Sequence, residues 1–121
     1  VHILVVDDEP IVRRLAARVL AGQGYAVSEA EDGLEALHFI ESQASELDVV
    51  VSDIIMPRLN GVELLQTLTS GFPHLPVILM SGFGHSRLVE MGVTAPCGIL
   101  AKPFPPEALL NEVRRCIRQR N

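Results

Sequence analysis

Val49-Val50-Val51-Ser52-Asp53, followed by Ile54-Ile55-Met56-Pro57, is an apolar run that ends in one acidic residue and a proline four positions later. The run is bounded by Asp48 and by Pro57, and this pattern predicts a buried strand over residues 49–52. Asp53 then follows at the carboxyl end of that strand. An aspartate in this position often only begins a turn. Whether Asp53 has a function therefore depends on what the other strands place beside it.

Length and composition exclude several classes of protein. A chain of 121 residues that is 48% hydrophobic is sufficient for one globular domain with a core of its own. The net charge of −5 argues against direct nucleic-acid binding. No apolar run approaches the ~20 residues of a membrane span, so membrane contact is not expected. No leader segment is visible, and a cytoplasmic location is expected. Because residue 1 is not methionine, we expect this domain, residues 1–121, to be excised from a longer protein.

The two cysteines, Cys97 and Cys116, lack the spacing of a metal or redox motif. In a reducing compartment such residues behave as small buried hydrophobes. The sequence therefore predicts neither a disulfide nor a metal pair here.

Strand and helix patterns alternate along the chain. Strands are expected over residues 2–6, 25–30, 49–52, 76–80 and 98–101. Helices are expected between and after them. The first has the apolar stripe Ile11, Leu15 and Val19, with the arginines off the stripe, and the second has Leu34, Leu37 and Ile40 and is capped by Asp32. The third, after the Asn60-Gly61 turn, has Val62, Leu65 and Leu68; a fourth has only a weak pattern over residues 85–91; and the last, after Pro105-Pro106, has Leu109, Val113, Cys116 and Ile117. Such alternation predicts an α/β fold, a doubly wound and mostly parallel five-stranded sheet with helices on both faces.

Ligands bind to such sheets outside the carboxyl ends of the strands. Asp7 and Asp8 follow the first expected strand, and Asp53, Ser81 and Lys102 follow the third, fourth and fifth. Two carboxylates about 5 Å apart repel by ~3 kcal/mol at an effective dielectric constant of ~20, so three of them call for a cation. A hard divalent ion such as Mg²⁺ suits oxygen ligands. With a lysine and a hydroxyl beside it, a carboxylate in this setting can accept a phosphoryl group.

These residues carry a family resemblance that covers essentially the whole chain. Asp7-Asp8, Asp53-Ile54-Ile55-Met56-Pro57, Ser81-Gly82 and Lys102-Pro103-Phe104, in this order, resemble the receiver domain of two-component response regulators. The resemblance implies a flavodoxin-like fold with the strand order 2-1-3-4-5 and a cis peptide bond between Lys102 and Pro103. Three contexts fit the resemblance: a stand-alone receiver, a receiver cut from a transcription factor, and the receiver of a hybrid histidine kinase. The stretches 53–64 and 102–110 look most like receivers attached to hybrid sensor histidine kinases.

The resemblance also implies the role of each site residue. Asp53 would accept the phosphoryl group from a histidine kinase or a histidine phosphotransfer protein, and Ser81 and Lys102 would contact that group. Asp7, Asp8, Asp53 and the backbone carbonyl of Ile55 would hold Mg²⁺, which Mn²⁺ could replace. Partners on the kinase side would contact the first helix and its neighbouring loops. Phosphorylation would switch the face formed by strand 4, helix 4 and strand 5, which with helix 5 could also form a homodimer.

Three residues depart from the family pattern or modify it. Ile99 stands three positions before Lys102, where members that signal through a rotating ring carry an aromatic residue. Signalling here would instead use backbone shifts around Ser81 and helix 4. Ile55 and Phe83 are apolar and flank the path expected for attacking water, so we hypothesise that they slow dephosphorylation.

Two other functional classes compete with a phosphoacceptor domain. A phosphatase with an aspartyl nucleophile, similar to the haloacid-dehalogenase family, would need a second aspartate two residues after the nucleophile. Ile55 occupies that position. A receiver-like interaction module that is never phosphorylated would not need the five polar residues that this chain retains.

Overall fold

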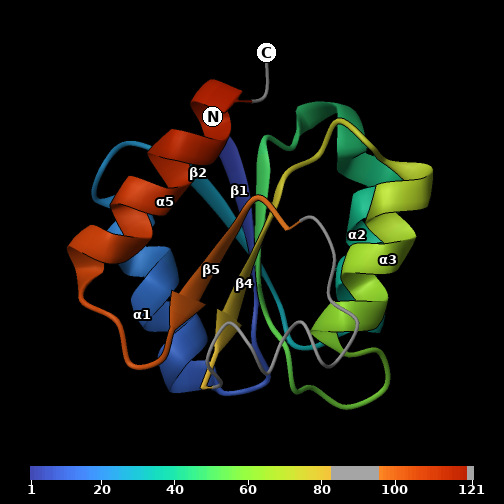
Figure 1. Cartoon of the computed structure of the whole chain (residues 1–121), viewed down its shortest axis with the longest axis horizontal. Helices are drawn as coiled ribbons and strands as arrows, with labels where there is room; N and C mark the ends of the chain where they lie inside the picture. The colour runs from blue at the N-terminus through green and yellow to red at the C-terminus, as the bar shows by residue number, and fades with distance from the viewer. Residues whose placement is uncertain (83–95, 120–121) are drawn as a thin grey trace.

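The computed structural model describes residues 1–82 and 96–119, and within residues 1–82 strands alternate with helices. Five strands form one parallel sheet in the order β2-β1-β3-β4-β5 (Figure 1), as the resemblance implied. The strands are β1 (His2–Val6), β2 (Ala26–Ala30), β3 (Val49–Asp53), β4 (Val77–Ser81) and β5 (Gly98–Ala101). The helices are α1 (Pro10–Ala21), α2 (Gly33–Gln43), the short 3-10 helix η1 (Ala44–Glu46), α3 (Gly61–Gly71) and α5 (Pro106–Gln119). The expected helix over residues 85–91 lies outside the described residues.

The sheet separates two apolar layers, as the predicted fold requires. Helices α1 and α5 cover one face and α2 and α3 cover the other (Figure 1). Side chains of β3 alternate between the layers because successive residues of a strand point to opposite faces. Val49 and Val51 pack with the α1 and α5 layer, whereas Val50 packs with the α2 and α3 layer. All five residues of β3 are buried, and Asp53, the last of them, lies at the rim of the sheet.

Side-chain caps begin the two helices next to the rim. Asp32 accepts a hydrogen bond from the backbone N–H of Glu35, so its predicted role as the cap of α2 is confirmed. Asn60 and Glu63 form a reciprocal capping box at the start of α3. Between them, Gly61 donates its N–H to the carbonyl of Ile54 at 2.8 Å. A Cβ at Gly61 would collide with the backbone of Asp53, so glycine allows α3 to begin directly against the end of β3.

The predicted apolar stripe of α1 is wrong for Ile11 and Leu15, whereas Val19 is part-buried and packs on the core. Ile11 and Leu15 are 84% and 60% exposed, and the buried residues of α1 are Arg13, Ala16, Ala17 and Leu20. Periodicity misled the prediction because two stripes of α1 carry apolar residues. The stripe that faces the sheet is the one with small alanines, since alanines let a helix approach a sheet closely.

The prediction for the two cysteines is also wrong, because the structure joins Cys97 and Cys116 in a disulfide. Cys97 directly precedes β5, and α5 runs back along the sheet, so that their Cα atoms lie 6.0 Å apart, which is within the range of a disulfide. Sequence spacing could not show this pairing, since the two residues are 19 positions apart. Cys116 is completely buried, as expected.

No helix among residues 1–82 and 96–119 has both the length and the apolar character that crossing a membrane requires.

Candidate functional site

The carboxyl ends of the strands bring the predicted side chains to one rim of the sheet. Asp7 follows β1, Asp53 ends β3, and Lys102 follows β5. The Lys102 ammonium lies 3.0 Å from Asp7 Oδ2 and 3.3 Å from Asp53 Oδ2. Asp53 is 46 positions after Asp7 and 49 positions before Lys102, yet both carboxylates contact the Lys102 ammonium, as the strand-end pattern predicted.

Lys102 is held beside the two carboxylates from both its side chain and its backbone. Its backbone N–H donates to the carbonyl of Ser81 at 2.7 Å, which fixes the end of β5 against the end of β4. Burial alone would lower the pKa of Lys102, but its hydrogen bond to Asp7 and the charges of Asp53 and Asp7 raise the pKa overall. The ammonium therefore stays charged at this rim.

Asp53 is 8% exposed, and its carboxylate has neighbours of both charges. Its Oδ1 accepts a hydrogen bond from the backbone N–H of Ile54 at 2.9 Å. Burial, and after it the negative charge of Asp7, raise the pKa of Asp53 above its ordinary value, against the opposing effect of Lys102. A further positive charge nearby would stabilise the ionised form of this carboxylate.

Asp7, Asp8 and Asp53 form a candidate cation site. Each offers one oxygen, and these oxygens all lie within 4.8 Å of one another. Three carboxylates against the single ammonium of Lys102 leave an excess of about two negative charges, which a divalent cation would neutralise. Asp7 is buried and its Oδ1 accepts the N–H of Glu9 at 2.9 Å, whereas Asp8 is exposed. The donor set is therefore suited to a hard divalent ion that keeps water on its open side.

The remaining predicted residues lie at the same rim. Ser81 ends β4 and is 1% exposed, and Ile55, two residues after Asp53, is 64% exposed. Their assigned contacts with a phosphoryl group and a metal stay predictions. The cis peptide bond between Lys102 and Pro103 is confirmed. Phe83, the second residue of the water-exclusion hypothesis, lies outside the described residues.

Arg13 is a site residue that the sequence analysis missed. Its guanidinium donates to the backbone carbonyl of Asp7 at 2.9 Å and to Glu29 Oε1 at 3.0 Å, and the residue is 7% exposed. A buried arginine thus fixes the loop that carries Asp7 and Asp8. The signal was present as an arginine four residues before Ala17 on the alanine-rich stripe of α1, but the arginines were predicted to lie off the buried face.

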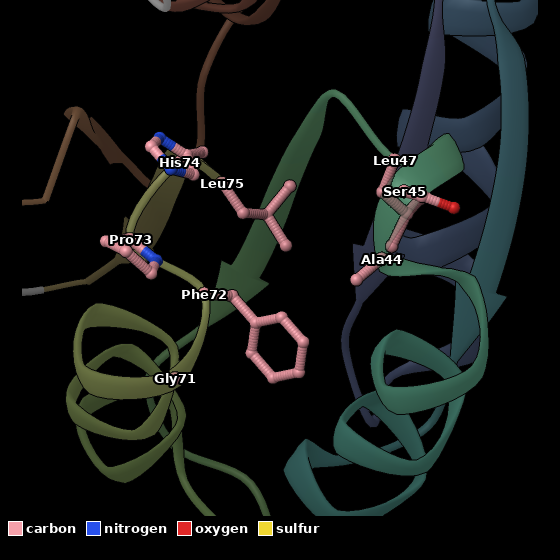
Figure 2. Close-up of a pocket in the computed structure, with 8 residues that line it drawn as sticks. All are labelled: Ala44, Ser45, Leu47, Gly71, Phe72, Pro73, His74 and Leu75. Carbon is pink, nitrogen blue, oxygen red and sulfur yellow. The ribbon is translucent and has the colours of Figure 1, made fainter.

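A separate cavity of about 300 Å³ lies between η1 and the segment after α3 (Figure 2). The ring of Phe72 and the side chain of Leu75 extend into it, whereas the hydroxyl of Ser45 points away. None of the rim carboxylates lines it. The cavity is therefore not part of the candidate site.

Comparison with known proteins adds an independent observation. Residues 3–114 match the response regulator receiver domain. The chain belongs to this family. A receiver domain protein from Clostridium thermocellum has the same fold, with a TM-score of 0.89 and 27% identity over 98% of this chain and 94% of that one. The receiver domain of the hybrid histidine kinase CckA matches 97% of this chain and 99% of that chain, with a TM-score of 0.80 and 38% identity.

Two curated relatives place the receiver domain in larger proteins. The sensor kinase CckA of Brucella abortus (strain 2308) is 35% identical over 98% of this chain, which spans 13% of that kinase. The response regulator MprA of Mycobacterium sp. (strain KMS) is 38% identical over 98% of this chain, which spans 51% of that regulator. This receiver domain therefore covers only part of the length of these relatives.

Proposed function

We propose that this receiver domain accepts a phosphoryl group on Asp53 from a phosphohistidine of a histidine kinase or a histidine phosphotransfer protein. The observation that carries the proposal is the meeting of Asp53 with Asp7 and Lys102 at the ends of three strands. Membership of the receiver family, whose curated relatives include a sensor kinase and a response regulator, supports it. The likeness to the receiver of a hybrid kinase favours a hybrid histidine kinase as the parent protein.

The residues divide the work of the transfer. An Asp53 carboxylate oxygen attacks phosphorus, and the phosphorus–nitrogen bond breaks as the imidazole leaves with its electron pair. Lys102 lies close enough to Asp53 to bind an oxygen of the new phosphoryl group, and Ser81 can donate a hydrogen bond to another. Mg²⁺, or Mn²⁺ in its place, would be held by Asp7, Asp8, Asp53 and the carbonyl of Ile55 and would neutralise phosphoryl charge. Catalysis here consists of positioning and charge neutralisation.

The donor protein needs a docking surface that borders Asp53, and α1 offers one. Ile11 and Leu15 expose large apolar side chains on α1. They line a cavity of about 380 Å³ that also reaches Lys102 and Phe104. An apolar surface next to the phosphoryl site suits a helix of the donor, because docking there would bring its histidine to the rim.

We assign the output surface to the β4 and β5 side of the sheet. Ser81 and Lys102 join the ends of β4 and β5, so a phosphoryl group bound by both would pull these ends together. Ile99 of β5 is part-buried and packs against the α2 and α3 layer, where an aromatic ring would otherwise be expected to rotate. We assign the switch to the backbone of β4 and β5. A homodimer through this face remains a prediction.

The proposal is tested by intact mass after incubation with acetyl phosphate and Mg²⁺. One phosphoryl adduct on the wild type, absent in Asp53→Asn and absent with EDTA, is expected. A folded wild type that binds Mg²⁺ but forms an adduct neither with acetyl phosphate nor with a phosphohistidine donor would favour an interaction module. Continuous release of phosphate from phosphoesters would instead favour the phosphatase, for which the apolar Ile55 offers no acid or base.

A further inference from the structure

The disulfide lies at the end of the sheet away from the carboxylate site. Cys97 directly precedes β5 and Lys102 directly follows it, so the four residues of β5 separate the disulfide from the rim. Cys116 belongs to the second half of α5. The bond therefore fastens α5 to the beginning of the strand whose other end delivers Lys102.

Other contacts fasten the same two elements. The Arg115 guanidinium donates to the carbonyl of Cys97 at 2.5 Å and to Glu112 at 2.7 Å. Leu109 and Val113 are buried against the sheet. Because these contacts do not involve the sulfur atoms, α5 can stay docked when the disulfide opens. The cross-link therefore adds to a contact between α5 and β5 that is already packed.

A surface cavity gives a reductant access to the sulfur of Cys97. The cavity measures about 230 Å³, and its lining residues are Pro73, His74, Pro76, Cys97, Cys116 and Gln119. Pro73, His74 and Gln119 are exposed and form its rim, Cys97 is part-buried, and Cys116 is fully buried at its base. Cys97 Sγ also lies 3.8 Å from the exposed Gln119 Oε1. An incoming thiolate therefore meets Cys97 first.

We propose that Cys97 and Cys116 form a redox-reversible cross-link that a dithiol reductant opens in the folded protein. One thiolate of the dithiol attacks Cys97 Sγ, and the Cys116 sulfur leaves with the electron pair of the sulfur–sulfur bond and takes up a proton. The second thiolate of the reductant then attacks the reductant sulfur that is bonded to Cys97 in the mixed disulfide, and Cys97 leaves as a thiolate that takes up a proton. The protein gains two electrons and two protons, and the dithiol becomes a cyclic disulfide. A disulfide oxidant such as oxidised glutathione reverses the change.

Reduction should loosen the contact between α5 and the beginning of β5 without unfolding the domain. A disulfide that closes a loop of 19 residues restricts the unfolded chain, and its loss is expected to lower the melting temperature by about 10 °C. Faster amide exchange is expected in the second half of α5, near Cys116. The effect on stability is independent of phosphorylation, so it does not rest on the function proposed above.

The test compares wild type with Cys97→Ser after incubation with oxidised glutathione or with dithiothreitol, both without denaturant. Iodoacetamide labelling and intact mass should find no free thiol in the oxidised wild type and two after dithiothreitol. The melting temperature of the wild type should fall on reduction and recover on reoxidation, while that of Cys97→Ser should not respond to dithiothreitol.

Two results would overturn the proposal, and both are measured on the wild type. Two alkylated cysteines in folded wild type after oxidised glutathione would show that no cross-link forms. A cross-link that resists dithiothreitol until urea is added would show a permanent structural bond. Non-reducing electrophoresis distinguishes the expected monomer from copies joined through Cys97.

Discussion

Asp53 is held in the folded domain at an energetic cost. Since burial and Asp7 raise its pKa, the ionised form is less favoured in the folded than in the unfolded chain at neutral pH. We predict that Asp53→Asn raises the free energy of unfolding by about 1 kcal/mol at pH 7 without metal. Mg²⁺ should stabilise the wild type more than the variant. Urea unfolding with Mg²⁺ and with EDTA measures both effects, and a variant less stable than the metal-free wild type would contradict the prediction.

The Asp32 carboxylate, in contrast to that of Asp53, stabilises the folded domain at neutral pH. Burial alone would raise the pKa of this carboxyl, but the N–H of Glu35 and the guanidinium of Arg58, 2.6 Å away, lower the pKa overall. A lowered folded pKa means that the carboxylate contributes stability above its unfolded pKa, and that this is lost as the pH falls through the folded value. Because Arg58 is half exposed, we expect Asp32→Asn, which keeps a capping oxygen, to cost about 1 kcal/mol at pH 7.

The pH dependence of Asp32→Asn distinguishes its charge from its cap. The difference between wild type and variant should shrink as the pH falls below ~4, because the wild-type carboxyl then becomes protonated and uncharged. Urea unfolding at pH 7 and at pH 3 measures this difference, with the exposed neighbour Glu31→Gln as the control. A cost that is equal at both pH values would show that the ion pair with Arg58 contributes nothing.

At the scale of the element, α1 presents two different faces. Its alanine face packs on the sheet, and its Ile11 and Leu15 face is exposed beside Lys102. We predict that Leu15→Asp lowers the rate of transfer from a protein phosphohistidine donor by about tenfold, the effect of one lost interface anchor. The rate with acetyl phosphate should not change, because a small donor needs no docking surface.

The control for that prediction is Gln66→Asp, a position on α3 across the sheet that is also exposed. It should leave both rates unchanged. Stopped reactions separated by intact mass give both rates for each variant. If Leu15→Asp slowed acetyl phosphate as much as the protein donor, its effect would lie in the site or in folding, and α1 would not be the docking surface.

At the scale of the whole molecule, the two apolar layers share one sheet and should unfold together. Leu20 belongs to the α1 and α5 layer and Leu64 to the other, and both are fully buried. Each leucine-to-alanine change should cost about 2–5 kcal/mol through lost burial and a cavity. Circular dichroism and the fluorescence of Tyr25, the single tyrosine in a chain without tryptophan, should report one coincident transition in urea. Separate transitions would mean that the layers are independent.

The sequence predicted the fold well because its strongest signals are local. Apolar runs such as residues 49–53 define strands, and their alternation with helices restricts the sheet to few topologies. The meeting of Asp7, Asp53 and Lys102 followed from their shared position at strand ends. The buried face of α1 and the disulfide could not be predicted in this way. The sequence offers two apolar stripes on α1, and only the packed structure decides which of them is buried. In the same way, only the packed structure decides whether two cysteines that are distant in the sequence come close enough to form a bond.

The most direct test of the central claim locates the phosphoryl group itself. After reaction with acetyl phosphate and Mg²⁺, borohydride reduction converts an aspartyl phosphate to homoserine, and peptide mass spectrometry identifies the converted position. We predict homoserine at position 53 alone, with none in samples treated with EDTA. Homoserine at Asp7 or Asp8, or an adduct that borohydride leaves unchanged, would contradict the assignment of Asp53 as the phosphoryl acceptor.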